Sequence, residues 1–268
     1  MAGGASKSSA KTANRPTVRR GGRTKMTYCV GLHTSRGLVF MSDTRTNAGV
    51  DNISVFRKMH TWCKPGDRVL TVLTAGNLAT TQSAISLLEE RTKSPGTRAP
   101  SILEAPSMFQ VARTVGQTLK DVIQANANTG QTADSTFNAS MILGGQIAGA
   151  PPRLFLIYPE GNFIEASPDT PFFQIGETKY GRPILVRAFE SDMSFEEAVK
   201  LLLVSFDSTL KANLTVGMPL DVQVYKRDSF EIGPSKRIER DDAYFQTISK
   251  GWGDALKRAF QSLPSFEF

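Results

Sequence analysis

The sequence predicts an α+β fold in which two antiparallel sheets stack face to face and helices cover both outer faces. Short segments that alternate apolar and polar residues occur in pairs around tight turns, which is typical of antiparallel hairpins. Groups of these segments alternate with segments of helical periodicity. The chain has 268 residues, 40% of them hydrophobic, so it can bury a sizeable core, and a single domain is the simplest organisation.

The first half of the chain supplies two hairpins and two helices. Residues 27–34 and 37–43 form the first predicted hairpin, with Thr27, Cys29 and Gly31 on one face. The other elements predicted in this half are strands at 56–63 and 68–75, joined by the Lys64-Pro65-Gly66-Asp67 turn, and helices at 78–91 and 108–124.

The second half repeats the alternation of strands and helices. A helix opens near Lys179, and another begins at Ser194, a typical N-cap residue that is followed by an acidic first turn. The other predicted elements are strands at 138–143, 153–158, 162–167, 172–175, 220–226 and 230–232, and a last helix within 241–263.

The formal net charge of +7 belongs to the N-terminal tail. Residues 1–25 contain seven Lys and Arg and no acid, which leaves 25 basic against 25 acidic residues in the rest. We expect residues 1–26 to be a disordered basic tail, a propeptide, or a stretch before a true start at Met26, and residues 27–268 to be the domain. The tail has no aromatic residue for base stacking, so nucleic acid is not an expected partner.

Composition also excludes several classes of protein. The two cysteines, Cys29 and Cys63, lack paired spacing, which favours a reducing, cytoplasmic compartment over a disulfide scaffold. No metal site and no cofactor are indicated, and no apolar run is long enough for a membrane span. The two histidines, His33 and His60, do not lie in a hydrolase motif.

The dipeptide Met26-Thr27 is the most informative local feature. A threonine with a free α-amine is nucleophile and base in one residue, because its amine accepts the proton that its hydroxyl loses. Such a site needs no distant histidine. Removal of Met26, or of the whole tail, would expose that amine.

Four separated segments resemble the bacterial Anbu proteins, relatives of HslV and of proteasome β-subunits, over most of the chain from Thr27. The resemblance implies the four-layer αββα sandwich of the N-terminal nucleophile hydrolases, which agrees with the order of elements read from the sequence. The segments that carry it are Thr27-Tyr28-Cys29-Val30-Gly31, Ser42-Asp43-Thr44-Arg45-Thr46-Asn47-Ala48-Gly49-Val50-Asp51, Phe56-Arg57-Lys58-Met59-His60 and Ile175-Gly176-Glu177-Thr178-Lys179-Tyr180-Gly181.

The resemblance implies a role for each residue of the site. Thr27 is the expected nucleophile, Lys58 the cation beside it, and Asp43 the partner of that lysine. Lys58 follows Thr27 one residue earlier than in HslV, which leaves open that Arg57 is the inward cation and Lys58 is exposed. The backbone amide of Gly76 is the expected oxyanion donor, although a turn glycine is an alternative.

Supporting residues follow from the same resemblance. Arg45 and Thr46, on an expected loop, are candidates for substrate binding. Glu177 stands where proteasome subunits carry a serine, and Thr215 is a candidate contact of the amine, whereas Asn213 is expected only to end a helix.

The implied activity is hydrolysis of peptide bonds through an acyl-enzyme on Thr27, by a homo-oligomer that forms a ring or an open assembly. The substrate would be a peptide or an unfolded protein, and any ATP-driven unfolding partner is a separate chain, since no P-loop is present. Two alternatives stay open: hydrolysis of small amides on the same fold, and an inactive scaffold in which the tail blocks Thr27.

Overall fold

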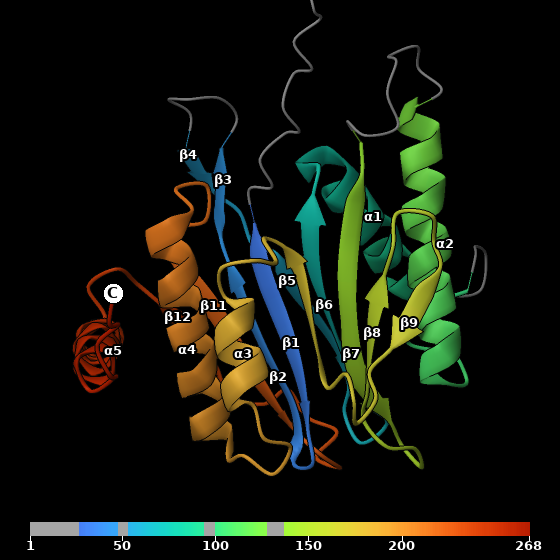
Figure 1. Cartoon of the computed structure of the whole chain (residues 1–268). Coiled ribbons are helices and arrows are strands. Elements are labelled where there is room, and N and C mark those ends of the chain that lie inside the picture. Colours follow the sequence, from blue (N-terminus) through green and yellow to red (C-terminus); the bar gives the residue numbers. More distant parts are fainter. Residues whose placement is uncertain (1–26, 48–52, 94–99, 128–136) are drawn as a thin grey trace, which may run out of the picture.

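The computed structural model describes residues 27–47, 53–93, 100–127 and 137–268. Two antiparallel five-stranded sheets stack against each other, and helices cover both outer faces (Figure 1). The predicted fold class is therefore confirmed. None of the helices in these ranges is both long enough and apolar enough to cross a membrane.

The first sheet has the strand order β10-β1-β2-β11-β12 and the second the order β5-β6-β7-β8-β9, while β3 and β4 form a separate ribbon. The strands are β1 (Tyr28–Thr34), β2 (Gly37–Asp43), β3 (Arg45–Asn47), β4 (Ile53–Val55), β5 (Met59–Lys64), β6 (Arg68–Gly76), β7 (Ala139–Ile147), β8 (Arg153–Ile157), β9 (Phe163–Glu165), β10 (Phe172–Gly176), β11 (Leu220–Lys226) and β12 (Ser235–Ile238). The helices are α1 (Leu78–Lys93), α2 (Met108–Ala127), α3 (Arg182–Ala188), α4 (Phe195–Ala212) and α5 (Ala243–Gln261).

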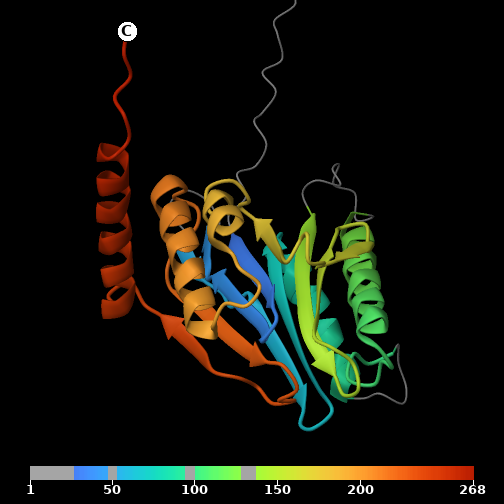
Figure 2. The same ribbon diagram turned by 60° about the horizontal axis from the view of Figure 1, so that its bottom comes forward.

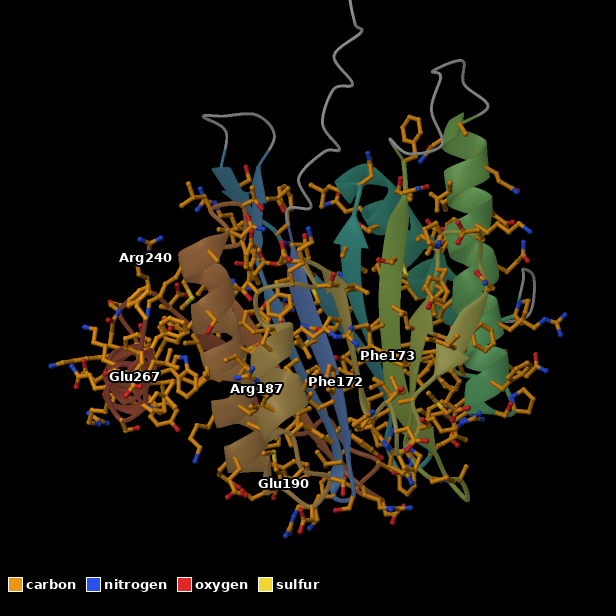
Figure 3. All side chains as sticks on the ribbon, in the orientation of Figure 1. Phe172, Phe173, Arg187, Glu190, Arg240 and Glu267 are labelled. Atoms are coloured by element: carbon orange, nitrogen blue, oxygen red, sulfur yellow. The ribbon has the colours of Figure 1, made fainter. Side chains whose placement is uncertain are left out.

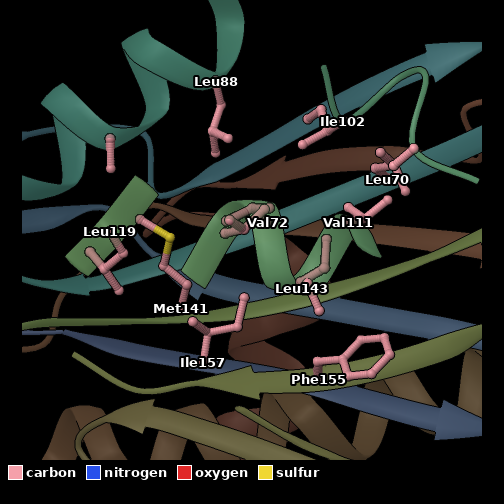
Figure 4. Packing of buried hydrophobic residues seen from close by; sticks show 14 of the residues in the cluster. Leu70, Val72, Leu88, Ile102, Val111, Leu119, Met141, Leu143, Phe155 and Ile157 are labelled. Carbon is pink, nitrogen blue, oxygen red and sulfur yellow. The ribbon is translucent and has the colours of Figure 1, made fainter. Parts of the chain in front are cut away.

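Three apolar clusters hold the layers together. The cluster between the sheets contains Cys29, Phe40 and Ile142, so the inward face predicted for β1 is confirmed. A second cluster joins α1 and α2 to the second sheet, where Val111 and Leu119 of α2 lie over the sheet residues (Figure 4). The third joins α3, α4 and part of α5 to the first sheet. Burial on both faces explains why the central strands are apolar almost throughout.

Adjacent residues on β10 show how one strand serves two clusters. Phe173 is buried between the sheets, whereas Phe172 turns to the helical side and packs on Phe189 with 6.0 Å between ring centroids (Figure 3). Successive side chains of a strand point to opposite faces, so a one-residue shift would exchange these environments.

Helix ends follow the sequence signals. Ser194 caps α4 in a capping box, because its side chain accepts from the Glu197 N–H and the Glu197 side chain accepts from the Ser194 N–H. Asp242 caps α5 by accepting from the Phe245 N–H, without the reciprocal bond. Beyond this cap α5 stands at the outer side of α4, with the C-terminus extending from it (Figure 2).

Three sequence predictions need correction. The segment 230–232 is not a strand, because Asp228 and Phe230 take positive φ angles and turn the chain away from β11, and pairing resumes only in β12. Arg45 and Thr46 lie on β3 instead of a loop, since they pair with Val55 and Ser54. Lys58 precedes β5 instead of lying within the strand.

The register brings several strand ends to one end of the molecule. In β1, Tyr28 pairs with Gly176 of β10 and Cys29 with Ser42 of β2, so Thr27 and Asp43 both lie at this edge. In the second sheet β6 ends at Gly76, and its tip points to the same end (Figure 1). Residues far apart in the sequence therefore meet here.

Candidate active site

Thr27 is the residue directly before β1, and its backbone is fixed by the neighbouring strand. Its carbonyl oxygen accepts a hydrogen bond of 2.6 Å from the Glu177 N–H. Gly176 has φ +79°, and a Cβ there would lie 2.0 Å from that oxygen, so a glycine is required. Sequence analysis gave Gly176 no role, although a glycine at a strand end is the signal for such a close approach.

Asp43 ends β2 and is fully buried. Its carboxylate accepts from the Tyr28 N–H at 3.0 Å, from Lys58 Nζ at 2.7 Å and from the Gly217 N–H at 3.3 Å. Burial raises the pKa of Asp43, while the ammonium and the two backbone donors oppose that rise. The carboxylate is thus a fixed acceptor that holds the lysine.

Lys58 is the inward cation, and Arg57 is exposed, which resolves the alternative left open by the spacing. Lys58 is only 5% exposed, and its Nζ donates at 2.7 Å both to Asp43 and to the Arg45 carbonyl oxygen. The Thr74 N–H donates to the Lys58 carbonyl at 2.9 Å and ties this residue to β6. A buried ammonium needs such partners because its desolvation is costly.

A second polar network lies behind Thr27. Glu177 Oε1 accepts from the N–H groups of Thr178 and Lys179, and its Oε2 accepts from Asn213 Nδ2 at 2.8 Å. Asn213 Oδ1 accepts in turn from the Thr215 N–H and from Thr215 Oγ1 at 2.6 Å. Asn213 caps the C-terminus of α4 as expected, but it also joins the two predicted supporting residues.

Gly76 lies at the junction of β6 and α1. Its φ is +118°, and a Cβ there would lie 2.4 Å from the Asn138 carbonyl oxygen, so a larger residue does not fit. The next residue, Asn77, caps α1 by accepting from the Thr80 N–H at 3.0 Å. A strand-to-helix junction of this kind matches the position predicted for Gly76.

Thr27, Lys58 and Gly76 line one small pocket between the two sheets. Thr46 also lines it, whereas Arg45 packs over Gly217, where a Cβ would lie 2.3 Å from the arginine Cδ. The remaining lining residues are Arg57, His60, Thr74, Ala75, Leu78, Thr81 and Gln82.

Comparison with known proteins shows the family of this chain. A family model described as proteasome subunit matches residues 24–224. An Anbu (Gly-1) mutant from Hyphomicrobium sp. strain MC1 is 50% identical with a TM-score of 0.84, over 90% of this chain and 100% of the other. The chain belongs to the proteasome family, among the Anbu proteins. No curated protein sequence matches it.

Two further Anbu structures are similar. Anbu from Yersinia bercovieri is 48% identical with a TM-score of 0.84, over 90% of this chain and 100% of the other. The helical assembly of the Anbu complex from Pseudomonas aeruginosa contains a chain that is 48% identical with a TM-score of 0.83, over 90% of this chain and 98% of the other.

Cys29 lies close to this Anbu site but is poorly suited to act as its nucleophile. Cys29 is fully buried, and burial raises the pKa of its thiol, so it is a poor thiolate nucleophile. Its Sγ lies 3.6 Å from the Thr74 carbonyl oxygen. Within the described ranges no group of three or more His, Cys, Asp or Glu side chains is arranged to hold a metal ion.

Proposed function

We propose that this chain is an N-terminal threonine hydrolase that cleaves peptide bonds through an ester on Thr27. The observation that carries the proposal is the buried Asp43–Lys58 pair, since Lys58 lines the same pocket as Thr27 and Gly76. A fully partnered buried cation beside a candidate nucleophile lowers the proton affinity of an adjacent amine.

The reaction follows from the chemistry of these groups. The neutral α-amine of Thr27 takes the hydroxyl proton while Oγ attacks the peptide carbonyl. A terminal amine has a pKa near ~8, and the neighbouring ammonium of Lys58 favours its neutral form. The backbone N–H of Gly76 donates to the developing oxyanion.

Collapse of the tetrahedral intermediate breaks the C–N bond, and the departing amine takes the proton held by the Thr27 amine. Water then attacks the ester, with the same amine as base, and restores the hydroxyl. Glu177 and Thr215 hold the backbone and surroundings of Thr27 through Asn213. Thr46 contacts the substrate from the pocket wall, and Arg45 orients Lys58 through its carbonyl.

The free amine requires Thr27 to be the first residue. We therefore propose that the mature chain starts at Thr27, after removal of Met26 or of the whole tail. Two free cysteines support action in the cytoplasm, a reducing compartment.

Self-association is part of the proposal. The Pseudomonas aeruginosa relative is described as a helical assembly of the Anbu complex, which supports an open homo-oligomer for this chain. Unfolded proteins or peptides would reach the sites within such an assembly, and an unfolding ATPase would be a separate partner.

Mass spectrometry of the native protein tests this function directly. An electrophilic peptide probe should add to Thr27 in a chain that starts there, and the modified peptide should be identified by fragmentation. A chain with an intact tail, or a probe bound to another residue, would favour the scaffold alternative. Turnover of small amides without turnover of peptides would favour the small-amide hydrolase.

A further inference from the structure

The pocket beside Thr27 is lined largely by polar and charged side chains. A peptide carbonyl placed between Thr27 and Gly76 directs the side chain of its own residue into the adjoining hollow. Thr46, Arg57, His60 and Gln82 line this hollow, together with Thr74, Ala75, Leu78 and Thr81. These side chains are therefore the ones that a substrate residue on the acyl side of the cleaved bond would meet.

The charge of the pocket is positive. Among the residues that the structure describes, no Asp or Glu lines it, and the charge of Lys58 is matched by Asp43 at 2.7 Å. Arg57 is exposed at the pocket and makes no hydrogen bond or ion pair with any residue that the structure describes. Its guanidinium is left for an incoming group.

His60 adds a neutral donor instead of a second charge. Burial and, to a smaller extent, the charge of Arg57 lower the pKa of His60 to about 4, while Glu89 opposes the shift. The Glu89 carboxylate is engaged by Trp62 Nε1 at 2.6 Å and by Lys93 at 3.2 Å. At neutral pH the imidazole is therefore uncharged and has one N–H to donate.

Three polar side chains of the pocket lack hydrogen-bond partners within the described part of the chain. Among the residues that the structure describes, none pairs by a side-chain hydrogen bond with Thr46, His60 or Gln82. An apolar substrate side chain would cover these donors without replacing their water, at a cost in binding. A basic side chain would meet Arg57, whereas a carboxylate accepts from all of them.

We propose that this pocket selects substrates with Asp or Glu at the residue whose carbonyl Thr27 attacks. The proposal rests on the proposed peptidase function and specifies its substrate class. Arg57 is the specificity-determining cation, and Thr46, His60 and Gln82 supply uncharged donors around the bound carboxylate.

The test uses the assembled protein with Thr27 exposed and fluorogenic peptides that differ only at this residue. Glu and Asp should give the highest kcat/KM, about tenfold or more above Gln, the uncharged isostere of Glu, as expected for a charge-assisted hydrogen bond. The preference should shrink as salt is added, since the guanidinium is exposed. A preference for Leu, Phe, Arg or Lys would overturn the proposal.

Two variants separate specificity from catalysis. Arg57→Gln should bring Glu and Gln peptides to similar kcat/KM, and Arg57→Glu should invert the preference towards Lys and Arg. Arg187→Gln on the outer helix α3 is the matched control and should change nothing (Figure 3). An unchanged Glu preference in Arg57→Gln would also overturn the proposal.

A small electrophile without a side chain distinguishes failure of the specificity proposal from failure of the proposed peptidase function. If it labels Thr27 in wild type and in Arg57→Gln alike, the peptidase function stands whichever substrate residue is preferred. If it labels Thr27 in neither protein, the proposed function fails, and the specificity proposal fails with it.

Discussion

The two walls of the pocket are built in opposite ways. On the side of the first sheet, Asp43 accepts three hydrogen bonds, Glu177 accepts three, and Asn213 joins Glu177 to Thr215. On the side of the second sheet, His60 and Gln82 have side chains without a hydrogen-bond partner in the described part of the chain.

Under the proposed function, this difference would separate chemistry from recognition. Groups that act on a reacting bond work best when their orientation is fixed before the substrate arrives. Groups that recognise a substrate gain most when their hydrogen bonds are left for it to complete. The contrast predicts that changes on the side of the first sheet, the first wall, alter rate and stability. Changes on the side of the second sheet, the second wall, should alter substrate selectivity.

The largest effect is expected from Thr27→Ala. Without the hydroxyl no ester forms, so peptide turnover and probe labelling should fall at least about a thousandfold while assembly persists. Thr27→Ser keeps both hydroxyl and amine and should retain part of the activity. Labelling of Thr27→Ala at the wild-type level would point to another nucleophile.

Breaking the buried pair tests the rigidity of the first wall. Lys58→Met leaves the Asp43 charge buried without its cation and should lower the free energy of unfolding by about 3–5 kcal/mol, besides abolishing activity. The double variant Lys58→Met, Asp43→Asn should recover stability but not activity. Urea denaturation and probe labelling measure the two effects.

An exposed ion pair is the control for this experiment. Arg237 and Asp221 lie 2.8 Å apart at the edge of the first sheet, and the Arg237 side chain is 38% exposed. Arg237→Ala should cost less than about 1 kcal/mol, because water screens such pairs. Equal losses in Lys58→Met and Arg237→Ala would contradict the view that burial makes the first pair matter.

Asn213→Ala tests the second network on the same wall. The variant removes the donor to Glu177 Oε2 and the acceptor of Thr215, at a cost of about 1–3 kcal/mol in stability. We expect kcat to fall by about tenfold with little change in KM, because Asn213 positions other groups and does not touch substrate. A change in KM alone, measured with Glu peptides, would argue against this role.

Much of the fold was predictable because long elements carry strong periodicity. The hairpin of β1 and β2 and the helices α2 and α4 appear in the sequence with nearly their observed bounds. The ribbon of β3 and β4 was missed because each strand has three residues, too few for a pattern.

The site was predictable only in part. Thr27, Asp43, Lys58 and Gly76 were found through the resemblance, and the structure brings them together. The contact of Asn213 with Glu177 joins residues 36 positions apart, so only folding reveals it. His60 and Gln82, which we propose for recognition, were missed for the same reason, since they come from a strand and a helix that share no motif.

The smallest effect concerns the second wall and depends on pH. The folded-state pKa of His60 is lowered to about 4 from its ordinary value of 6.5. Between these two pH values the imidazole is therefore protonated in the unfolded chain and neutral in the folded chain. Stability therefore falls as pH drops from 6.5 towards 4. At pH 5 this contribution is on the order of 1 kcal/mol, and His60→Gln should remove it.

Urea denaturation at pH 7 and pH 5 measures the difference. The loss of stability on acidification should be smaller in His60→Gln than in wild type, while probe labelling of Thr27 at pH 7 stays close to normal. Complete loss of labelling in His60→Gln would mean that His60 takes part in catalysis. The two sides of the pocket would then not differ in the way proposed. An identical pH response in both proteins would mean that folding does not lower the pKa of His60, so the imidazole would add a positive charge to the pocket below about pH 6.5.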